Sequence, residues 1–324
     1  KLPDSIGRLS SLVSLHLEGT QLKEIPDQVG ALNNLEQLKL GSIELLDSIP
    51  GSIGGMLCLR DVELDNLSIA ELPESIGLLE RLDTLKLNNC KNLRKLPASI
   101  GNLASLRYLY MDKNAVTELP DEIGRLLRLK VLRMAKHPDS GAPNNNGRES
   151  NQTDLVAEHQ IQPVVLPKSF SGLSSLEELD ARSWRISGKL SDDLEKFSSL
   201  QTLNLGDNDF RLLPSSLRGL SVLKKLLLPK CKELKLLPPL PSSLVELNVA
   251  NCYALEYLAD ISSLENLEEL QLTNCKKITD IPGLECLKSL KRLYTGGCNS
   301  CLPAIKKRLS KVLSLFSSSS FINS

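Results

Sequence analysis

Leucines recur along the chain in one pattern that repeats about every 23 residues. A full copy occupies residues 82–101 and reads LDTLKLNNCKNLRKLPASIG. Within it, Leu85 and Leu87 flank one polar residue, so an extended segment points both leucines to the same side. A single copy has nothing to cover those leucines, and a neighbouring copy must do so. The pattern therefore predicts a coil of stacked turns, in which each turn is one copy of the repeat.

The central apolar residue of each expected strand marks the position of each turn along the chain. It falls at Leu15, Leu38, Val62, Leu85, Leu109, Leu132, Leu179, Leu203, Leu226, Leu247, Leu270 and Leu293. Successive positions are 21 to 24 residues apart, except for one step of 47 residues after Leu132. We expect twelve short parallel strands that lie about 4.8 Å apart.

The second part of each early turn reads Leu-Pro-x-x-Ile-Gly or a close variant, at 2–7, 25–30, 72–77, 96–101 and 119–124. Proline suits the first turn of a helix and glycine suits its end. We expect single-turn or 3₁₀ helices there, on the convex side of the coil. Their inward apolar residues would be Ile6, Val29, Ile76, Ile100 and Ile123. A strand and a short helix in this period are typical of the leucine-rich repeat. The predicted fold is an α/β solenoid, a horseshoe of about twelve turns with its strands on the concave face.

A polar run interrupts the solenoid, which we place at 1–302. The run covers 136–163 and is rich in Pro, Gly, Asn and Ser. It is either a degenerate repeat or a loop that leaves the coil, and its composition favours the loop. Because the first residues already lie inside a turn, we expect the natural protein to continue upstream.

Beyond the repeats, residues 303–324 are predicted to form a capping helix and a serine-rich tail. The stretch LPAIKKRLSKVLSLF (302–316) places its apolar residues on one helical face. These residues are Ile305, Leu309, Val312 and Phe316. Such a helix would cover the apolar end of the coil.

Composition narrows the function. The chain has 39 basic and 39 acidic residues, so it lacks the basic excess typical of proteins that bind nucleic acid or membranes. No apolar run reaches the roughly 18 residues that span a bilayer, and no signal peptide is visible. The expected partner is a protein.

Eight cysteines raise the question of disulfides or zinc. Five of them stand five residues after the strand centre: Cys90, Cys231, Cys252, Cys275 and Cys298. At that position a small side chain can turn inward and bond loop backbone groups. The pair Cys298 and Cys301 lacks the four ligands of a structural zinc site. We expect reduced thiols and no metal.

No catalytic set is evident. The three histidines match no nucleophilic arrangement, and no phosphate-binding loop is present. The chain is therefore predicted not to be an enzyme, and no cofactor is expected in this region.

Strand residues beside the central leucine should point outward to the concave face. Tyrosine and arginine are typical interface residues, and the chain has only five tyrosines. We predict a contact cluster at Tyr108, Tyr110 and Arg133, near Arg182 and Trp184. Further candidates are an acidic group, Asp61, Glu63 and Asp65, and the pair Arg292 and Tyr294 on the last strand.

The second half of the chain resembles a known family. The stretches LPPLPSSLVELNVANCYALE and LTNCKKITDIPGLECLKSLKRLYTGGC resemble the C-terminal repeats of plant intracellular nucleotide-binding leucine-rich-repeat immune receptors. Within these disease-resistance proteins the likeness is to the branch with an N-terminal TIR domain. The chain departs from that family after its repeats, where a serine tail stands in place of a β-rich domain.

The resemblance implies a role in innate immunity, in the cytoplasm or the nucleus. The repeats would recognise a pathogen effector or a guarded host protein on the concave face. They would also contact an upstream nucleotide-binding domain and hold it inactive. Two alternatives stay open: the ectodomain of a surface leucine-rich-repeat receptor, and a constitutive intracellular repeat scaffold. Paired capping cysteines and a regular GxIP signature, both absent here, would favour the ectodomain.

Overall fold

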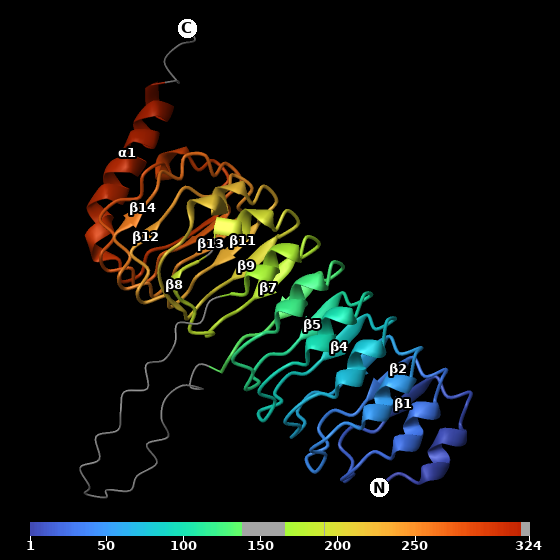
Figure 1. Ribbon diagram of the computed structural model, residues 1–324. Helices are drawn as coiled ribbons and strands as arrows, with labels where there is room; N and C mark the ends of the chain where they lie inside the picture. The colour runs from blue at the N-terminus through green and yellow to red at the C-terminus, as the bar shows by residue number, and fades with distance from the viewer. Residues whose placement is uncertain (138–165, 191, 319–324) are drawn as a thin grey trace, which may run out of the picture.

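The computed structural model describes residues 1–137, 166–190 and 192–318. They form one curved coil that runs from the N-terminal turns to a C-terminal helix (Figure 1). A parallel sheet of twelve strands lines it in chain order, with one three-residue strand per turn. The strands are β1 (Ser14–His16), β2 (Gln37–Lys39), β3 (Asp61–Glu63), β4 (Thr84–Lys86), β5 (Tyr108–Tyr110), β6 (Val131–Arg133), β7 (Glu178–Asp180), β9 (Thr202–Asn204), β11 (Lys225–Leu227), β13 (Glu246–Asn248), β15 (Glu269–Gln271) and β16 (Arg292–Tyr294).

The register of this sheet confirms the predicted positions of the strand centres. The twelve predicted central residues pair with one another from Leu15 to Leu293. In β5 the central residue Leu109 is fully buried, whereas its neighbours Tyr108 and Tyr110 are half-buried. The chain folds as a leucine-rich-repeat horseshoe, as its periodicity predicts.

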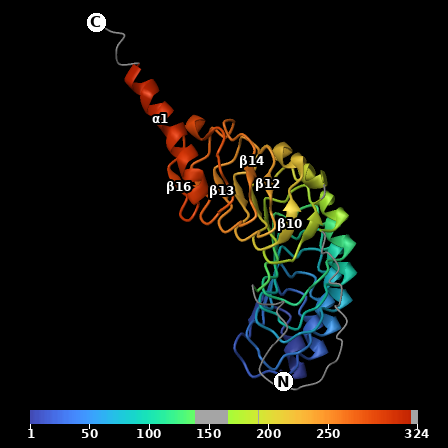
Figure 2. The ribbon, with the colours of Figure 1, turned by 90° about the vertical axis from the view of Figure 1, so that its left-hand side faces the viewer.

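Short 3₁₀ helices return the chain on the opposite side. Figure 2 shows them in a row along the outer edge of the coil. In the described ranges they are η1 (Asp4–Arg8), η2 (Asp27–Ala31), η3 (Gly51–Gly55), η4 (Glu74–Leu78), η5 (Ala98–Asn102), η6 (Asp121–Arg125), η7 (Lys168–Gly172), η8 (Asp192–Lys196), η9 (Ser215–Gly219), η10 (Leu284–Cys286) and η11 (Asn299–Cys301). The predicted inward residues Val29, Ile76, Ile100 and Ile123 are buried, and Ile6 in the first turn is partly buried.

The proline and the glycine that recur in this motif have other roles than expected. In η4, Pro73 is the extended residue just before the helix, and Gly77 lies inside the helix. A Cβ atom at Gly77 would come within 2.5 Å of the Ser99 carbonyl oxygen in the next turn. Close stacking of turns, and not helix termination, is therefore what this glycine allows.

A second parallel sheet runs through the later turns, and the sequence reading missed it. It contains β8 (Ser187–Lys189), β10 (Asp209–Leu212), β12 (Leu236–Leu237) and β14 (Tyr257–Leu258). The Lys235 amide bonds the Arg211 carbonyl at 3.0 Å, whereas the Arg94 amide lies 3.4 Å from the Ala70 carbonyl at the corresponding place in an earlier turn. The turns approach more closely on this side in the second half.

The interruption lies between β6 and β7. Those two strands pair directly, with Leu132 opposite Leu179. The predicted insertion at 136–163 begins at the described Lys136 and His137; the rest of it lies outside the described residues.

The C-terminal helix α1 (Leu302–Ser318) follows the last turn, as predicted. Its first turns pack on the coil. Ile305 is buried, but Leu309 is 42% exposed, so the expected continuous apolar face is wrong at that residue. Arg308 supplies the main polar anchor: it contacts Asp280 at 2.6 and 2.7 Å and Glu285 at 2.8 and 2.9 Å. The side chains of Val312 and Phe316 lie outside the described residues.

Candidate protein-binding surface

The three central residues of the predicted contact cluster lie side by side on the main sheet. Tyr110 on β5 is opposite Lys86 on β4 and Arg133 on β6. The Arg133 guanidinium carbon lies 5.8 Å from the centre of the Tyr110 ring, within cation–π range. Tyr108 is on the same strand, and the Arg107 guanidinium carbon is 5.6 Å from its ring centre. The structure therefore forms one aromatic and basic patch here.

Carboxylates hold the arginines of this patch in place. Arg133 Nε donates to Glu178 Oε1 at 2.6 Å, and this hydrogen bond raises the pKa of the Arg133 guanidinium. Arg182 follows β7, and its Nε donates to both oxygens of Asp180, at 2.9 and 3.0 Å. Asp180 is itself opposite Arg133 in the sheet, so Arg182 joins the patch as predicted. Fixed side chains lose less entropy on binding than free ones.

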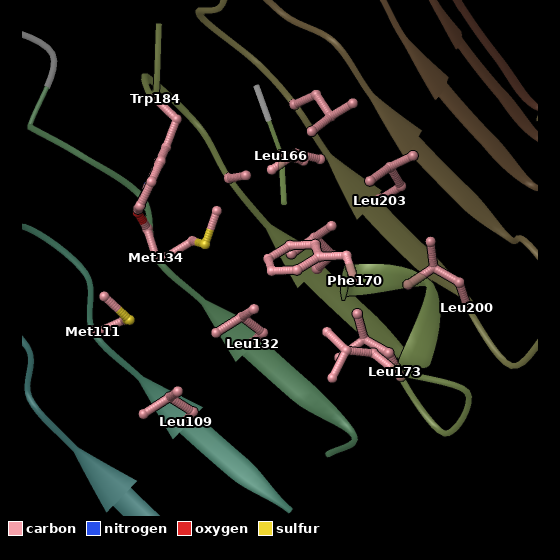
Figure 3. Packing of buried hydrophobic residues seen from close by; sticks show 14 of the residues in the cluster. Leu109, Met111, Leu132, Met134, Leu166, Phe170, Leu173, Trp184, Leu200 and Leu203 are labelled. Atoms are coloured by element: carbon pink, nitrogen blue, oxygen red, sulfur yellow. The ribbon is translucent and has the colours of Figure 1, made fainter. Parts of the chain in front are cut away.

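Trp184 does not join the patch. Its side chain is 5% exposed and lies in the core beside Met134 (Figure 3). Its Nε1 donates to the Met134 carbonyl, and Lys136 Nζ lies 4.6 Å from its ring centre. The prediction of Trp184 as a contact residue is wrong, because the residue occupies the inward position five places after Leu179.

The same inward position holds five of the eight cysteines, Cys90, Cys231, Cys252, Cys275 and Cys298. Cys90 Sγ lies 3.2 Å from the Leu64 carbonyl, and Cys231 Sγ lies 3.3 Å from the Leu205 carbonyl. Both carbonyls belong to the preceding turn, as the Met134 carbonyl does for Trp184. All eight cysteines are within the described residues and are free thiols. Its offset of five residues from the strand centre Leu179 could have assigned Trp184 to this position from the sequence alone.

Two of the three acidic candidates, Glu63 and Asp65, contact residues of the next turn. Glu63 Oε2 is 3.0 Å from Lys86 Nζ, and Asp65 accepts from the Asn88 amide at 2.7 Å and from Asn88 Nδ2 at 3.2 Å. Burial raises the pKa of Asp65. Asp61 Oδ1 is buried and has no hydrogen-bond partner among the described residues. Asp61 and Glu63 belong to the strand surface next to Lys86, whereas Asp65 joins two turns.

Arg292 and Tyr294 lie on β16, at the far end of the sheet from the tyrosine patch. Arg292 Nε donates to Glu269 Oε2 at 2.6 Å, and Tyr294 is 43% exposed. Five strands separate β16 from β6, so a partner that touches both groups must span much of the coil. The sequence reading overlooked Arg107, which its position directly before Tyr108 could have suggested.

Two family descriptions match parts of the chain: "Leucine-rich repeat region" over residues 49–146, and "Leucine Rich Repeat" over residues 199–220. TMV resistance protein N of Nicotiana glutinosa is 40% identical over 93 residues, which are 28% of this chain and 8% of that protein. The disease resistance-like protein DSC1 of Arabidopsis thaliana is 44% identical over 72 residues, 22% of this chain and 6% of that protein. The chain is thus a leucine-rich-repeat region with similarity to plant disease-resistance proteins, and the matched stretches span a small part of each of them.

Solved structures agree on the fold. A leucine-rich-repeat protein of Leptospira interrogans superposes with a TM-score of 0.60 at 24% identity, covering 97% of this chain and 91% of that one. PEPR1 in its complex with AtPEP1 superposes with a TM-score of 0.58 at 21% identity, covering 91% of this chain and 46% of that one. At these identities the likeness concerns the fold.

In the described ranges no helix has the length and apolar character to cross a bilayer. Among the same residues, no three His, Cys, Asp or Glu side chains group as metal ligands. The solenoid is typical of proteins that bind other proteins.

Proposed function

We propose that this chain is the sensing region of a plant intracellular immune receptor with a nucleotide-binding switch, of the TIR-domain branch. One observation carries the binding role: Tyr108, Tyr110 and Arg133 lie together on the concave sheet, with Arg133 fixed by a carboxylate. Large, rigid side chains of this kind anchor protein interfaces. The similarity to two plant resistance proteins supports the receptor context.

In this proposal the ligand is a pathogen effector or a host protein that the receptor guards. Without it, the repeats contact an upstream nucleotide-binding domain and stabilise its inactive state, in the cytoplasm or the nucleus. Binding on the concave face competes with that contact and shifts the equilibrium to the active state. A shift from 1% to 99% active needs about 5.5 kcal/mol of differential binding.

The test is the activity of the natural full-length protein in leaf tissue, with and without residues 1–302. We expect cell death without a pathogen when the repeats are removed, because the restraint is lost. Co-expression of the 324-residue chain as a separate polypeptide should reduce that cell death. A version of the chain with Leu85→Ala and Leu109→Ala, which empties the fully buried core, is the unfolded control.

The proposal fails if the protein without its repeats stays silent while it accumulates normally. It also fails if the full-length protein is found at the cell surface, which would favour the ectodomain alternative.

A further inference from the structure

Two arginines break the pattern of one repeat position. The residue four places before the strand centre is small or uncharged in ten turns: Ser11, Asn34, Cys58, Ser105, Ser175, Ser199, Val222, Ser243, Asn266 and Ser289. It is arginine in the other two, Arg81 and Arg128. Asn34 at this position bonds the Ser10 carbonyl at 2.7 Å, and Ser243 bonds the Leu223 carbonyl at 2.8 Å. The fold therefore does not require a long cationic side chain there.

These arginines flank a hollow of about 360 Å³ at the edge of the sheet where β3 to β6 begin. Ser105 stands in the turn between them, and its short side chain leaves the space open. Arg60, Asp83 and Arg107 complete the lining. Because adjacent turns are about 4.8 Å apart, Arg81 and Arg128 come from backbone positions roughly 10 Å apart.

The hollow carries excess positive charge. Four guanidinium groups and one carboxylate line it, and that carboxylate, Asp83, is bonded by Arg107. Arg60 Nε is 3.8 Å from Glu36, a long contact between two exposed side chains. Arg81 Nη1 lies 3.7 Å from the Cys58 sulfur. Arg128 has no ion pair among the described residues.

A second hollow on the same edge shows what the repeat forms without these arginines. It measures about 390 Å³ and lies between η9 and the last strand, lined by serines, an asparagine and valines. Its charged residues are Lys224 and Glu268, which balance each other. Hollows of similar size therefore form at two places in the repeat, whereas the excess positive charge is found in the hollow of turns three to six.

We propose that the hollow between Arg81 and Arg128 is a binding site for an acidic segment of a partner protein, in which two side-chain carboxylates each meet one guanidinium. The planar guanidinium fork binds carboxylates with two parallel hydrogen bonds. Arg107 also contacts Tyr108, so the site continues into the tyrosine patch of the concave face. The site rests on its own charge and shape and does not depend on the receptor proposal.

A protein segment fits this site better than a nucleic acid does. A nucleic acid needs a basic stripe that follows its phosphates. Here the same edge carries Glu36 before the hollow and Glu177 after it, and the chain has no net charge. The positive charge is confined to about four turns, which suits a short acidic segment.

The test is the affinity of the purified 324-residue chain for a fluorescein-labelled peptide of alternating Glu and Ser residues. A peptide with Gln in place of Glu and a phosphoserine peptide of equal charge are the comparison probes. The variant Arg81→Gln with Arg128→Gln should bind the Glu peptide about tenfold more weakly or worse. The control, Arg125→Gln with Arg218→Gln, removes the same charge from exposed positions on η6 and η9 and should bind like the wild type.

A third variant, Ser105→Glu, puts a carboxylate into the hollow and should also prevent binding, although it leaves both arginines in place. Equal weakening by both double variants would overturn the proposal, because binding would then follow net charge. Binding of the phosphoserine peptide without the Glu peptide would overturn it as well, as would no binding at physiological salt. Since only the purified chain is used, these outcomes leave the receptor proposal to its own test.

Discussion

At the scale of single residues, two positions after each strand connect the turns. Four places after the strand centre the backbone is left-handed in eleven of the twelve turns, with Asn at Asn66, Asn89, Asn251 and Asn274 and glycine at Gly19 and Gly297. Asn and Gly tolerate this conformation best. One place further on, the side chain turns inward, and in several turns it bonds a carbonyl of the preceding turn, as in Cys90, Cys231, Cys252 and Cys275. Asn208 is the most fully bonded of these, with an exposure of 1%.

Replacement of Asn208 by alanine should cost about 2 to 3 kcal/mol, because buried backbone groups lose their partners. Asn208 Nδ2 donates to the carbonyls of Ala181 and Leu205 at 3.0 and 2.8 Å, and Oδ1 accepts from the Ile186 amide at 2.9 Å. Asn208→Cys should recover part of the loss, since cysteine fills this position in other turns. Urea unfolding of the three proteins, followed by circular dichroism, measures the difference. Equal stability of all three would show that these bonds contribute nothing.

The inward cysteines could be predicted from sequence, because they follow a fixed offset from a leucine. Trp184 has the same offset, but a large aromatic residue among few suggested a surface role, and the structure corrects this. The role of Asp65 was also hidden. Its carboxylate accepts from the amide of Asn88 in the next turn, and sequence does not give that distance.

At the scale of elements, the repeat period was sufficient to predict the strands of the main sheet but not those of the second sheet. The twelve strands repeat an apolar signature, so their centres could be placed residue by residue. The strands β8, β10, β12 and β14 are two to four residues long and exist only where the turns come close enough to bond. The helix α1 was expected as an apolar cap, but Arg308 with two carboxylates is its principal polar contact.

Arg308→Met should release the start of α1 from the coil. We expect backbone amides of residues 302–310 to exchange about tenfold faster, because two charge-assisted contacts are lost. Lys306→Met, at an exposed position of the same helix, is the matched control. Hydrogen exchange followed by mass spectrometry gives the rates. Unchanged rates in Arg308→Met would mean that Ile305 alone holds the helix.

This anchor also predicts a pH dependence. Hydrogen bonds from Arg308 lower the pKa of Asp280 below its ordinary value of 3.8. A carboxyl whose pKa is lowered by folding stabilises the folded state above its unfolded pKa and loses that effect as the pH falls through the folded value. Protection of 302–310 should therefore fall below about pH 4 in the wild type. Arg308→Met should show little of this change.

At the scale of the whole molecule, the coil continues across the interruption. Arg133 is opposite Asp180, and Lys130 Nζ reaches Glu177 Oε1 at 2.7 Å, so the two halves of the solenoid are joined through β6 and β7. Composition indicated a loop at 136–163, but the structure does not describe 138–165. The contacts that join the two halves are made by β6, before that segment, and by β7 and the residues beside it, after that segment.

Deletion of residues 138–160 should leave the solenoid folded with its stability changed by no more than about 1 kcal/mol, because loop length has a small entropic effect. Urea unfolding should keep a single transition with the same slope. Loss of cooperative unfolding would mean that the segment contributes a repeat to the core.

The central claim is that the patch of Tyr108, Tyr110 and Arg133 on the concave face binds a protein partner. The most direct measurement is proximity labelling with the natural full-length protein in leaf tissue, for the wild type and for Tyr108→Ala, Tyr110→Ala, Arg133→Ala. The matched control changes Thr202, Asn204 and Lys225 to alanine, on β9 and β11 of the same sheet. We expect a partner that labels with the wild type and the control, does not label with the patch variant, and triggers cell death only with the first two. The same labelled proteins and the same response for all three, at equal protein levels, would contradict the claim.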